Sequence, residues 1–594
     1  MQVGIYVPVY EVFPGIEPTL PVFTSLLGRL SLTDVLFWCA RLNHVLSRRS
    51  ELSHEQKQAF GLRQFFTHVE ITRLDQFCAA HGGLVDSFTV FFRGQLLELV
   101  RWAALFCDDH PEDGTTFEDP QIRRTFAQVC LIASDVWGRR IYGDALSLAD
   151  GLEAARQRAL GPFRKGAEGS LISSELAQDL GRGWLLFRKH MPRLDSGFES
   201  LFQSATGLST EDYFICWSAL LTNYAKPNAE ATIFNEETSA PKTTSPDLFA
   251  RFLAVESQSP EGLREALWPA TARADALAGV SSPYDYRPLR ERPILKSRDG
   301  RMILLDPVFA AEKCAIGPLF HVLPRANANR IFETFGKAFE QYAGETLERT
   351  FPAMSGLVTP LARNLAGRGA AGEEFEIDAS LNYVTDLVLF EVKAVWGRES
   401  DLAPDRSDAL LDLLRQRFSV TAESVKGVGQ LARVVSAIVG RRWLGPMDEF
   451  GGVQRVFPVV VVHDRLSGSP GFGSFVLDEF RKALGPHVPA ARGQLACGQL
   501  TVFGPIVLTA EDLELLEVST ERAGIRDLLA EYSHWSPDRM LPFSAYLAEI
   551  SASGRVLANR ALAATSMDVL TRSMQRLFEK SPRNGDGDGT AAAP

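Results

Sequence analysis

Several features that identify common protein classes are missing from this chain of 594 residues. Its seven cysteines are scattered and include no Cys-x-x-Cys pair, which argues against a disulfide framework and favours free thiols in a reducing cytoplasm. The ten histidines form no His-x-x-x-His or His-Glu-x-x-His pattern, so no zinc site is predicted.

Long apolar runs and excess positive charge are also missing. Runs such as residues 456–462 are far too short to cross a bilayer. The first residues lack the basic and apolar stretches of a secretory signal, so we expect a cytoplasmic protein without a membrane partner. Lys and Arg number 62 against 73 Asp and Glu, for a net charge of −11. A general nucleic-acid coat is therefore excluded, and any contact with phosphate requires a local basic patch.

The first part of the chain has the composition and periodicity of helical globular protein. Hydrophobic residues make up 45% of the chain, and its length exceeds what one core organises. Apolar residues recur at helical spacing from about residue 33 to residue 224, after a short opening strand. These patterns predict an α-helical N-terminal domain over residues 1–235. For residues 236–325 we expect a linker, a short helix and a β-hairpin that turns at Asp299-Gly300.

Helical and strand patterns alternate in the remainder of the chain. We expect a helix over 330–349, strands over 373–381 and 386–396, and a helix over about 408–438, followed by a strand over 456–462, a helix over 475–484, a strand over 500–507 and a helix from Thr509. This order predicts an α/β domain over residues 326–517. A C-terminal helical segment over 518–580 and a disordered tail over 581–594 complete a multidomain α plus α/β protein.

Charged residues follow an apolar run in the centre of this α/β domain. Residues 387–390 read as a strand buried on both faces, and Glu391 and Lys393 come directly after them. Burying a charged side chain is energetically unfavourable unless it is paired with an opposite charge or takes part in binding or catalysis. Strand alternation places Glu391 and Lys393 on one face and Val392 on the other. A hairpin after the preceding strand would bring Asp378 alongside Glu391.

Two neighbouring carboxylates repel each other unless a cation lies between them. Oxygen ligands without His or Cys favour Mg²⁺ or Mn²⁺. A lysine beside such a cation, here Lys393, can orient or help to deprotonate a water and offset negative charge on a phosphate. Asp378, Glu391 and Lys393 together therefore suit hydrolysis of a phosphodiester.

These residues resemble the motif of the PD-(D/E)xK, or restriction-endonuclease-like, nuclease superfamily. The similarity consists of Ile377-Asp378, a gap of twelve residues and Glu391-Val392-Lys393, within residues of about 330–515. It implies a mixed β-sheet flanked by helices and cleavage of nucleic acid with Mg²⁺. Two departures are Ile377, where the motif has proline, and Val434, where one branch has an aromatic residue.

The resemblance also implies supporting residues. Asp378 and Glu391 would hold the metal together with the Val392 carbonyl. Glu340, on the preceding helix, would complete the metal shell. Gln430 and Lys426, on the following helix, would support the site.

We therefore hypothesise a divalent-metal-dependent nuclease, with DNA favoured as substrate. The absence of an ATPase motif and the large helical half suggest an antiphage defence effector or restriction-type enzyme, in which the helical domain regulates, recognises targets, or binds a protein partner or a second copy. One alternative is a non-cleaving protein that binds nucleic acid or a partner through a nuclease-like fold. Another is a sensor whose functional core is the helical half.

Overall fold

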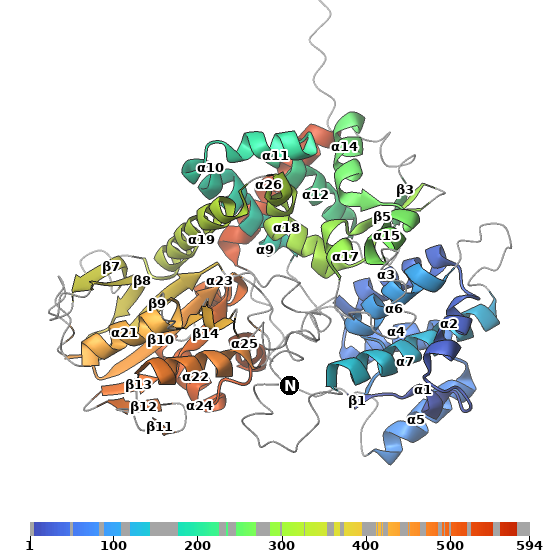
Figure 1. Cartoon of the computed structure of the whole chain (residues 1–594), viewed down its shortest axis with the longest axis horizontal. Coiled ribbons are helices and arrows are strands. Elements are labelled where there is room, and N and C mark those ends of the chain that lie inside the picture. The colour runs from blue at the N-terminus through green and yellow to red at the C-terminus, as the bar shows by residue number, and fades with distance from the viewer. Residues whose placement is uncertain are drawn as a thin grey trace, which may run out of the picture.

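Three groups of elements are distinguishable in the computed structural model (Figure 1). The first is helical and N-terminal, the second is mainly helical and central, and the third contains a large β-sheet. The structure describes residues 5–47, 52–81, 88–107, 119–142, 176–224, 233–235, 245–268, 286–297, 300–325, 327–352, 361–368, 374–394, 412, 414–416, 418–419, 426–439, 450, 452–463, 468, 471–484, 490–491, 494–497, 500–519, 524–550 and 559–578.

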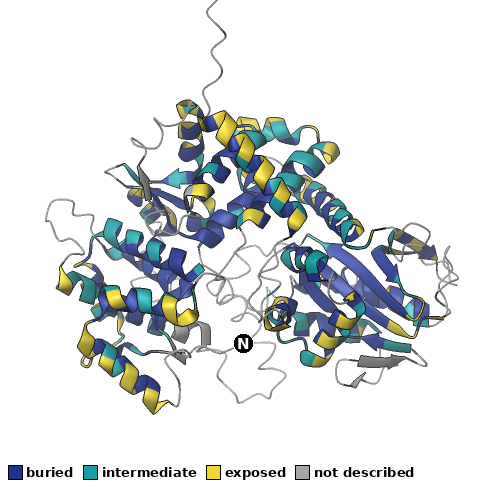
Figure 2. Cartoon of the chain, turned by 180° about the vertical axis from the view of Figure 1, so that it is seen from behind, coloured by how far each residue is buried: buried dark blue, intermediate teal, exposed yellow. Residues whose placement is uncertain are grey.

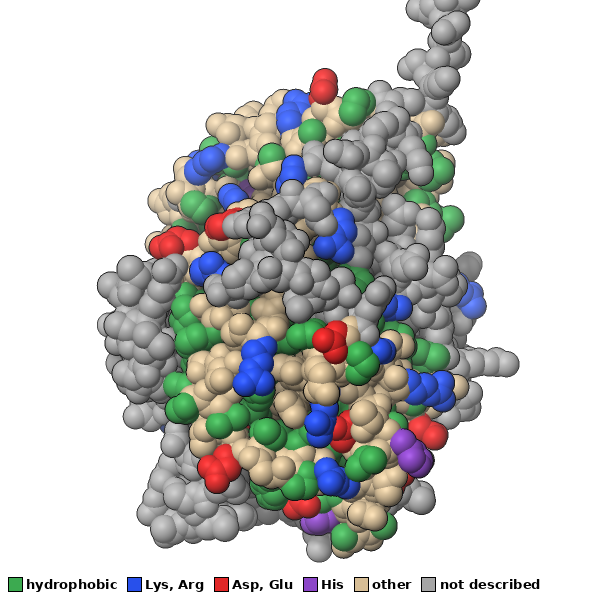
Figure 3. All heavy atoms as spheres, turned by 90° about the vertical axis from the view of Figure 1, so that its right-hand side faces the viewer, with side chains coloured by type: hydrophobic (Ala, Val, Ile, Leu, Met, Phe, Trp, Pro, Cys, Tyr) green, Lys and Arg blue, Asp and Glu red, His purple; other side chains and the backbone are tan. Residues whose placement is uncertain are grey.

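The N-terminal group is a bundle of helices around its own hydrophobic core. Its elements are β1 (Ile5–Tyr6), α1 (Val9–Val12), α2 (Leu20–Leu27), α3 (Leu32–Ser47), α4 (His54–Phe65), α5 (His68–Ala80), β2 (Phe88–Thr89), α6 (Arg93–Phe106) and α7 (Pro120–Tyr142). The abundant phenylalanines supply this core, as in the edge-to-face contact of Trp38 with Phe65. On the face drawn in Figure 3, acidic and basic side chains are interspersed rather than gathered by sign.

The central group combines helices with a small sheet. Its elements are α9 (Leu176–Trp184), η3 (Leu185–His190), α10 (Met191–Leu194), α11 (Phe198–Thr206), α12 (Thr210–Tyr224), β3 (Ile233–Asn235), α14 (Pro246–Glu256), β4 (Ser257–Gln258), α15 (Pro260–Leu267), α17 (Arg287–Glu291), β5 (Ile294–Lys296), β6 (Arg301–Leu304), α18 (Pro307–Val322) and η6 (Leu323–Arg325). The expected hairpin is confirmed as β5 and β6, which pair antiparallel around Gly300 in a left-handed conformation. The expected linker falls mostly on residues 236–244, outside the described residues.

The boundary expected at residue 235 does not coincide with a boundary between cores. The buried apolar residues of α1 to α7 share one core with those of α15, α17 and part of β5, β6 and α18, whereas α9 to α12 belong to the core that also holds the large sheet. Close helix packing causes this division: a Cβ at Gly183 of α9 would lie 1.9 Å from the Cys314 carbonyl oxygen of α18. The helical half of residues 1–235 is therefore split between two cores.

The third group is built on a mixed sheet with strand order β11-β12-β13-β10-β9-β8-β7. Its elements are α19 (Ala328–Thr350), β7 (Leu361–Arg368), β8 (Glu374–Asn382), β9 (Asp386–Lys393), α21 (Val428–Val439), β10 (Arg455–Val462), α22 (Phe472–Leu484), β11 (Ala490–Ala491), β12 (Gln494–Cys497), β13 (Leu500–Phe503), β14 (Ile506–Thr509) and α23 (Ala510–Ser519). β7, β8 and β9 form an antiparallel meander, and β10 lies parallel to β9 after α21. The α plus α/β expectation is confirmed at this level.

Three local expectations in this region need correction. The helix expected over 408–438 is not continuous, because Ser419 is a bend and Gly427 has φ 52°, so α21 begins only at Val428. The strand expected over 500–507 is divided into β13 and β14, and both pair with β10. The strand β7 had no predicted counterpart; its residues show no clean period of two.

Helices cover both faces of the sheet, whose strands are largely buried (Figure 2). α19 and α23 pack on one face with Val388, Phe390 and Val392. α21 and α22 pack on the other with Leu387 and Leu389. The C-terminal helices α24 (Ile525–Trp535) and α25 (Phe543–Ile550) join the first of these cores, and α26 (Arg560–Phe578) packs against α9 and α12. The expected tail, 581–594, lies outside the described residues.

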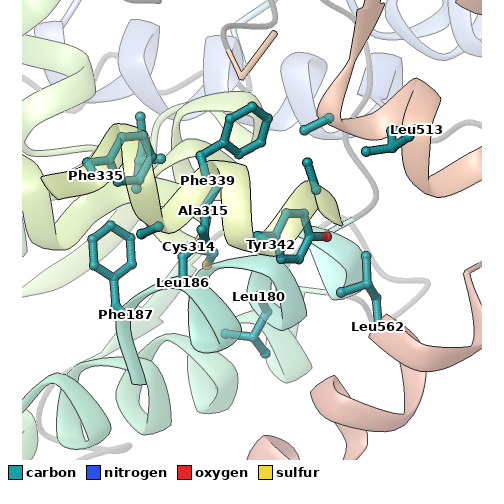
Figure 4. Packing of buried hydrophobic residues seen from close by; sticks show 14 of the residues in the cluster. Leu180, Leu186, Phe187, Cys314, Ala315, Phe335, Phe339, Tyr342, Leu513 and Leu562 are labelled. Carbon is teal, nitrogen blue, oxygen red and sulfur yellow. The ribbon is translucent and has the colours of Figure 1, made fainter. Parts of the chain in front are cut away.

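The helix α19 links the central group to the sheet. Its Phe335, Phe339 and Tyr342 meet Phe187 of η3 and Leu513 of α23 in one apolar cluster (Figure 4). No helix within the described ranges combines the length and apolar composition that crossing a membrane requires.

A buried ion-pair network reinforces this junction. The Arg182 guanidinium of α9 contacts the Glu514 carboxylate of α23 at 2.6 and 2.8 Å and Asp179 at 2.9 Å. The Tyr342 hydroxyl of α19 donates to the same Glu514 carboxylate at 2.6 Å. These side chains are almost completely excluded from solvent, so each charge depends on its partners.

We expect Arg182→Leu to destabilise the protein by roughly 3–5 kcal/mol, because it leaves buried carboxylates without their cation. The measurement is chemical denaturation followed by circular dichroism. Arg368→Leu, which removes an exposed arginine 3.6 Å from Glu374, is the matched control and should change stability by less than about 1 kcal/mol. Equal stabilities of the two variants would contradict the role given to the network.

Candidate functional site

The β8–β9 hairpin brings Asp378 opposite Glu391. The paired residues include Ala379 with Phe390, and the same register continued by one residue sets Asp378 against Glu391. The regular ladder ends here. Instead, the Asp378 Oδ2 accepts a hydrogen bond of 2.6 Å from the Val392 backbone N–H. The Asp378 carboxylate therefore accepts the hydrogen bond that a backbone carbonyl of β8 would accept in a regular β8–β9 ladder.

The alternation of β8 also changes at Asp378. Phe375 and Ile377 pack toward α21, whereas Ala379 and Leu381 pack toward α19. Residues two apart on a regular strand share a face, so the chain must twist between them. Asp378 lies at this change of face and is partly exposed, between more buried neighbours.

Glu391 is a buried acid with one cationic neighbour. Its Oε1 lies 2.7 Å from the Lys393 Nζ, and its Oε2 has no hydrogen-bond donor among the described residues. Burial raises the pKa of Glu391 to about 8, although the Lys393 ammonium opposes this shift. Burial alone would lower the pKa of Lys393, but the carboxylates of Glu391 and Asp378 raise it above its ordinary value.

Two further carboxyls belong to the same electrostatic group. Burial raises the pKa of Asp378, against the opposing effects of Lys393 and of the Val392 N–H. Burial and the charge of Asp378 both raise the pKa of Glu340 on α19. Three acids and one lysine from β8, β9 and α19 therefore shift one another's pKa values. They are the residues that the sequence predicted to lie together: Asp378, Glu340, Glu391 and Lys393.

A cavity of about 210 Å³ opens beside Asp378, between α19 and the strands β7 and β8. Glu340 and Val392, two of the expected metal ligands, also line it, whereas Glu391 and Lys393 do not. Within the part of the chain that the structure describes, no three acidic, histidine or cysteine side chains converge as ligands of one ion. The expected ligands are thus neighbours but form no closed shell among the described residues.

The carboxylate oxygens of the site nevertheless suit a hard divalent cation. Glu391 presents a buried carboxylate oxygen that finds no hydrogen-bond donor within the described part of the chain, and leaving such an oxygen unpaired is unfavourable. Asp378 is held in place through its Oδ2 by a backbone amide. Carboxylate oxygens of this kind suit Mg²⁺ or Mn²⁺. Asp378 and Glu391 are therefore the residues that would hold the metal, with Glu340 reachable from the cavity side.

Gln430 and Lys426, which were expected on one helix after the motif, do not lie on the same element. Gln430 on α21 donates from its Nε2 to the Glu376 carbonyl of β8 at 2.9 Å, so it anchors the strand that carries Asp378. Lys426 precedes α21 instead of lying on it, and it is exposed. The expectation that Lys426 lies on this helix was wrong, because the left-handed Gly427 delays the start of the helix.

Several residues of the cavity were not anticipated. Lys337 of α19 and the β7 residues Arg363 and Asn364 line it together with Asp378. Lys337 is one turn before Glu340, so helical spacing could have indicated it. No sequence pattern pointed to Arg363 and Asn364, because the strand β7 that carries them was not predicted.

Comparisons with known proteins yielded no family model, no curated protein and no solved structure that matches this chain.

We expect Glu391→Gln to alter how stability depends on pH. The folded protein holds the Glu391 proton up to about pH 8, whereas an ordinary glutamate releases it near 4.5. The folded state therefore binds the extra proton between these values, and the free energy of unfolding falls as pH rises through this window. Glutamine mimics the protonated acid and removes this contribution.

In chelator, the Tm of Glu391→Gln relative to wild type should therefore rise between pH 5 and 8, by an amount equivalent to a few kcal/mol at pH 8. Scanning calorimetry at several pH values measures it. Glu374→Gln, an exposed position on β8, is the control and should run parallel to wild type. A Glu391→Gln curve that also runs parallel to wild type would refute the buried-acid assignment.

Proposed function

We propose that this protein is a divalent-metal-dependent nuclease that hydrolyses phosphodiester bonds, with DNA as the favoured substrate. The observation that carries the proposal is the register that sets Asp378 opposite Glu391 at the point where the β8–β9 ladder ends, with Lys393 paired to Glu391. This arrangement supports the resemblance to the PD-(D/E)xK superfamily, which also implies a mixed sheet flanked by helices.

Each side chain has a distinct chemical task in this proposal. Glu391 and Asp378 would hold Mg²⁺ or Mn²⁺, which would polarise the phosphate and acidify a water. Because the pKa of Lys393 is raised, the lysine stays protonated at neutral pH. It therefore orients the water and offsets negative charge on the phosphate, and it does not serve as the proton acceptor.

Glu391 couples metal binding to proton release. Burial raises the pKa of this carboxyl to about 8 although Lys393 lies beside it, so its ionised form is disfavoured. A cation next to the carboxylate favours its ionised form. Metal affinity should consequently increase with pH across the neutral range.

The described residues of the helical groups supply none of the charged side chains of the proposed reaction centre, although Leu194 of α10 lines the adjacent cavity. We assign to them regulation, target recognition or binding of a protein partner or second copy, as in a defence effector or restriction-type enzyme; this step is an analogy.

A second candidate is a binding protein on a nuclease-like fold. The observation that favours it is the direct 2.7 Å contact of Lys393 with Glu391, in which the ammonium supplies the positive charge that a metal would bring. Chelator-insensitive binding of nucleic acid, with no product under any metal, would identify this case.

In a cleavage assay with plasmid, linear and single-stranded substrates, we expect activity with Mg²⁺ or Mn²⁺ and none in chelator. Asp378→Asn, Glu391→Gln and Lys393→Met should each lower the rate by at least about 10²-fold, because each removes a charge from the reacting centre. Glu374→Gln is the matched control on β8 and should cleave as wild type does. Full activity of all three site variants, with folding verified by circular dichroism, would end the assignment.

A further inference from the structure

The cavity beside Asp378 is lined by charged and apolar side chains. Lys337 and Arg363 bring two positive charges to it, and Glu340 and Asp378 bring two carboxyls. Its volume is about 210 Å³.

A backbone distortion forms one wall of the cavity. Asn364 has φ 49°, a left-handed conformation inside the strand β7. The β7–β8 ladder pairs Arg363 with Ala379 and Leu365 with Ile377, but it omits the pair of Asn364 and Asp378 between them. Left-handed residues other than glycine are unfavourable and concentrate at functional sites. The interruption exposes Asn364 and lets Asp378 face the cavity.

A glycine on α19 forms the opposite wall. A Cβ built at Gly344 would lie 2.1 Å from the Arg363 Nη2 and 2.2 Å from its Cζ. Glycine inside a helix is unfavourable by about 1 kcal/mol relative to alanine. Gly344 is buried one turn after Glu340, and the Arg363 guanidinium lies in the space that a side chain at this position would occupy.

The Arg363 guanidinium retains capacity to bind an anion. Its Nη1 lies 2.9 Å from the Glu348 Oε1, and Glu348 is half exposed. Such a surface pair contributes little and is readily exchanged. The planar guanidinium offers a fork of N–H donors that matches a phosphate. The Arg363 charge also lowers the pKa of Asp378, which places the guanidinium within electrostatic reach of the proposed metal ligand.

We propose that this cavity is a phosphate-binding subsite, in which Arg363, seated on Gly344 and assisted by Lys337, holds a backbone phosphate of the nucleic-acid strand next to the one that is cleaved. The inference rests on the proposed nuclease function and adds a substrate-binding residue to it. Arg363 contacts the substrate, whereas Gly344 is a positioning residue that acts through Arg363.

The first test is steady-state cleavage by the full-length protein. Arg363→Gln should raise KM about tenfold or more while kcat stays within about twofold, because a charge-assisted phosphate contact is lost. Arg363→Lys should recover part of this loss. Gly344→Ala, which displaces the guanidinium without changing charge, should raise KM in the same direction. Arg368→Gln, an exposed arginine on the same strand, is the control and should leave KM unchanged.

The second test measures binding without cleavage. Fluorescence anisotropy follows a labelled single-stranded thymidine oligonucleotide bound to the Glu391→Gln protein in chelator, over a series of salt concentrations. Adding Arg363→Gln should lower the slope of log K against log salt by about 0.7, the value for one phosphate contact on a single strand. Inorganic phosphate as competitor distinguishes a site for free phosphate from one for nucleic acid.

The outcomes separate the two proposals. Cleavage by wild type with an unchanged KM in Arg363→Gln and Gly344→Ala would overturn the subsite and leave the nuclease intact. Absence of cleavage, together with an oligonucleotide affinity that depends on Arg363, would overturn the nuclease and support the phosphate subsite. Competition by millimolar phosphate, with no Arg363-dependent change in the salt slope for the oligonucleotide, would overturn the assignment to nucleic acid.

Discussion

The burial of one carboxyl, Glu391, constrains everything around the candidate site. An acid in this position is stable only when it is protonated, paired with a cation or bound to a metal. Lys393, two residues later on the same strand, provides the cation, and strand alternation places the two groups on one side of β9. The local structure thus favours positive charge at this point, whether from an ammonium or from a divalent ion.

The β8–β9 ladder ends at Asp378, next to Glu391 and Lys393, and this irregularity shapes the candidate site. Regular pairing of β8 with β9 would occupy the Val392 N–H with a backbone carbonyl and turn Asp378 away from α19. Instead the Asp378 carboxylate takes that N–H, and β8 exchanges the faces of its side chains. The left-handed Asn364 on the neighbouring strand accompanies this change. One irregularity therefore shapes both the acidic group and the adjacent cavity.

The helix α19 packs against neighbouring helices on one side and lines the cavity on the other. Its apolar side joins η3, α9 and α23 through Phe335, Phe339 and Tyr342, and Tyr342 reaches the buried ion pair of Arg182 with Glu514. Its other side presents Glu340 and Gly344 to the cavity. A shift of the central helical group would therefore move the cavity wall directly. The N-terminal group meets this region through another buried pair, Arg93 with the Asp306 cap of α18, at 2.8 Å.

The sequence alone determined which residues are candidates for a site, and most of the local order. An apolar run followed by Glu391 and Lys393, with Asp378 one hairpin earlier, predicted that these residues are neighbours, because strand alternation and hairpin register are local rules. Only the tertiary structure decided the division of the helical half between two cores, since helical periodicity shows that a face is buried but not against what. It also decided that Arg363 and Gly344 are in contact, because β7 packs against α19. A glycine inside a helix is unfavourable, so local propensity gave no reason to expect this contact.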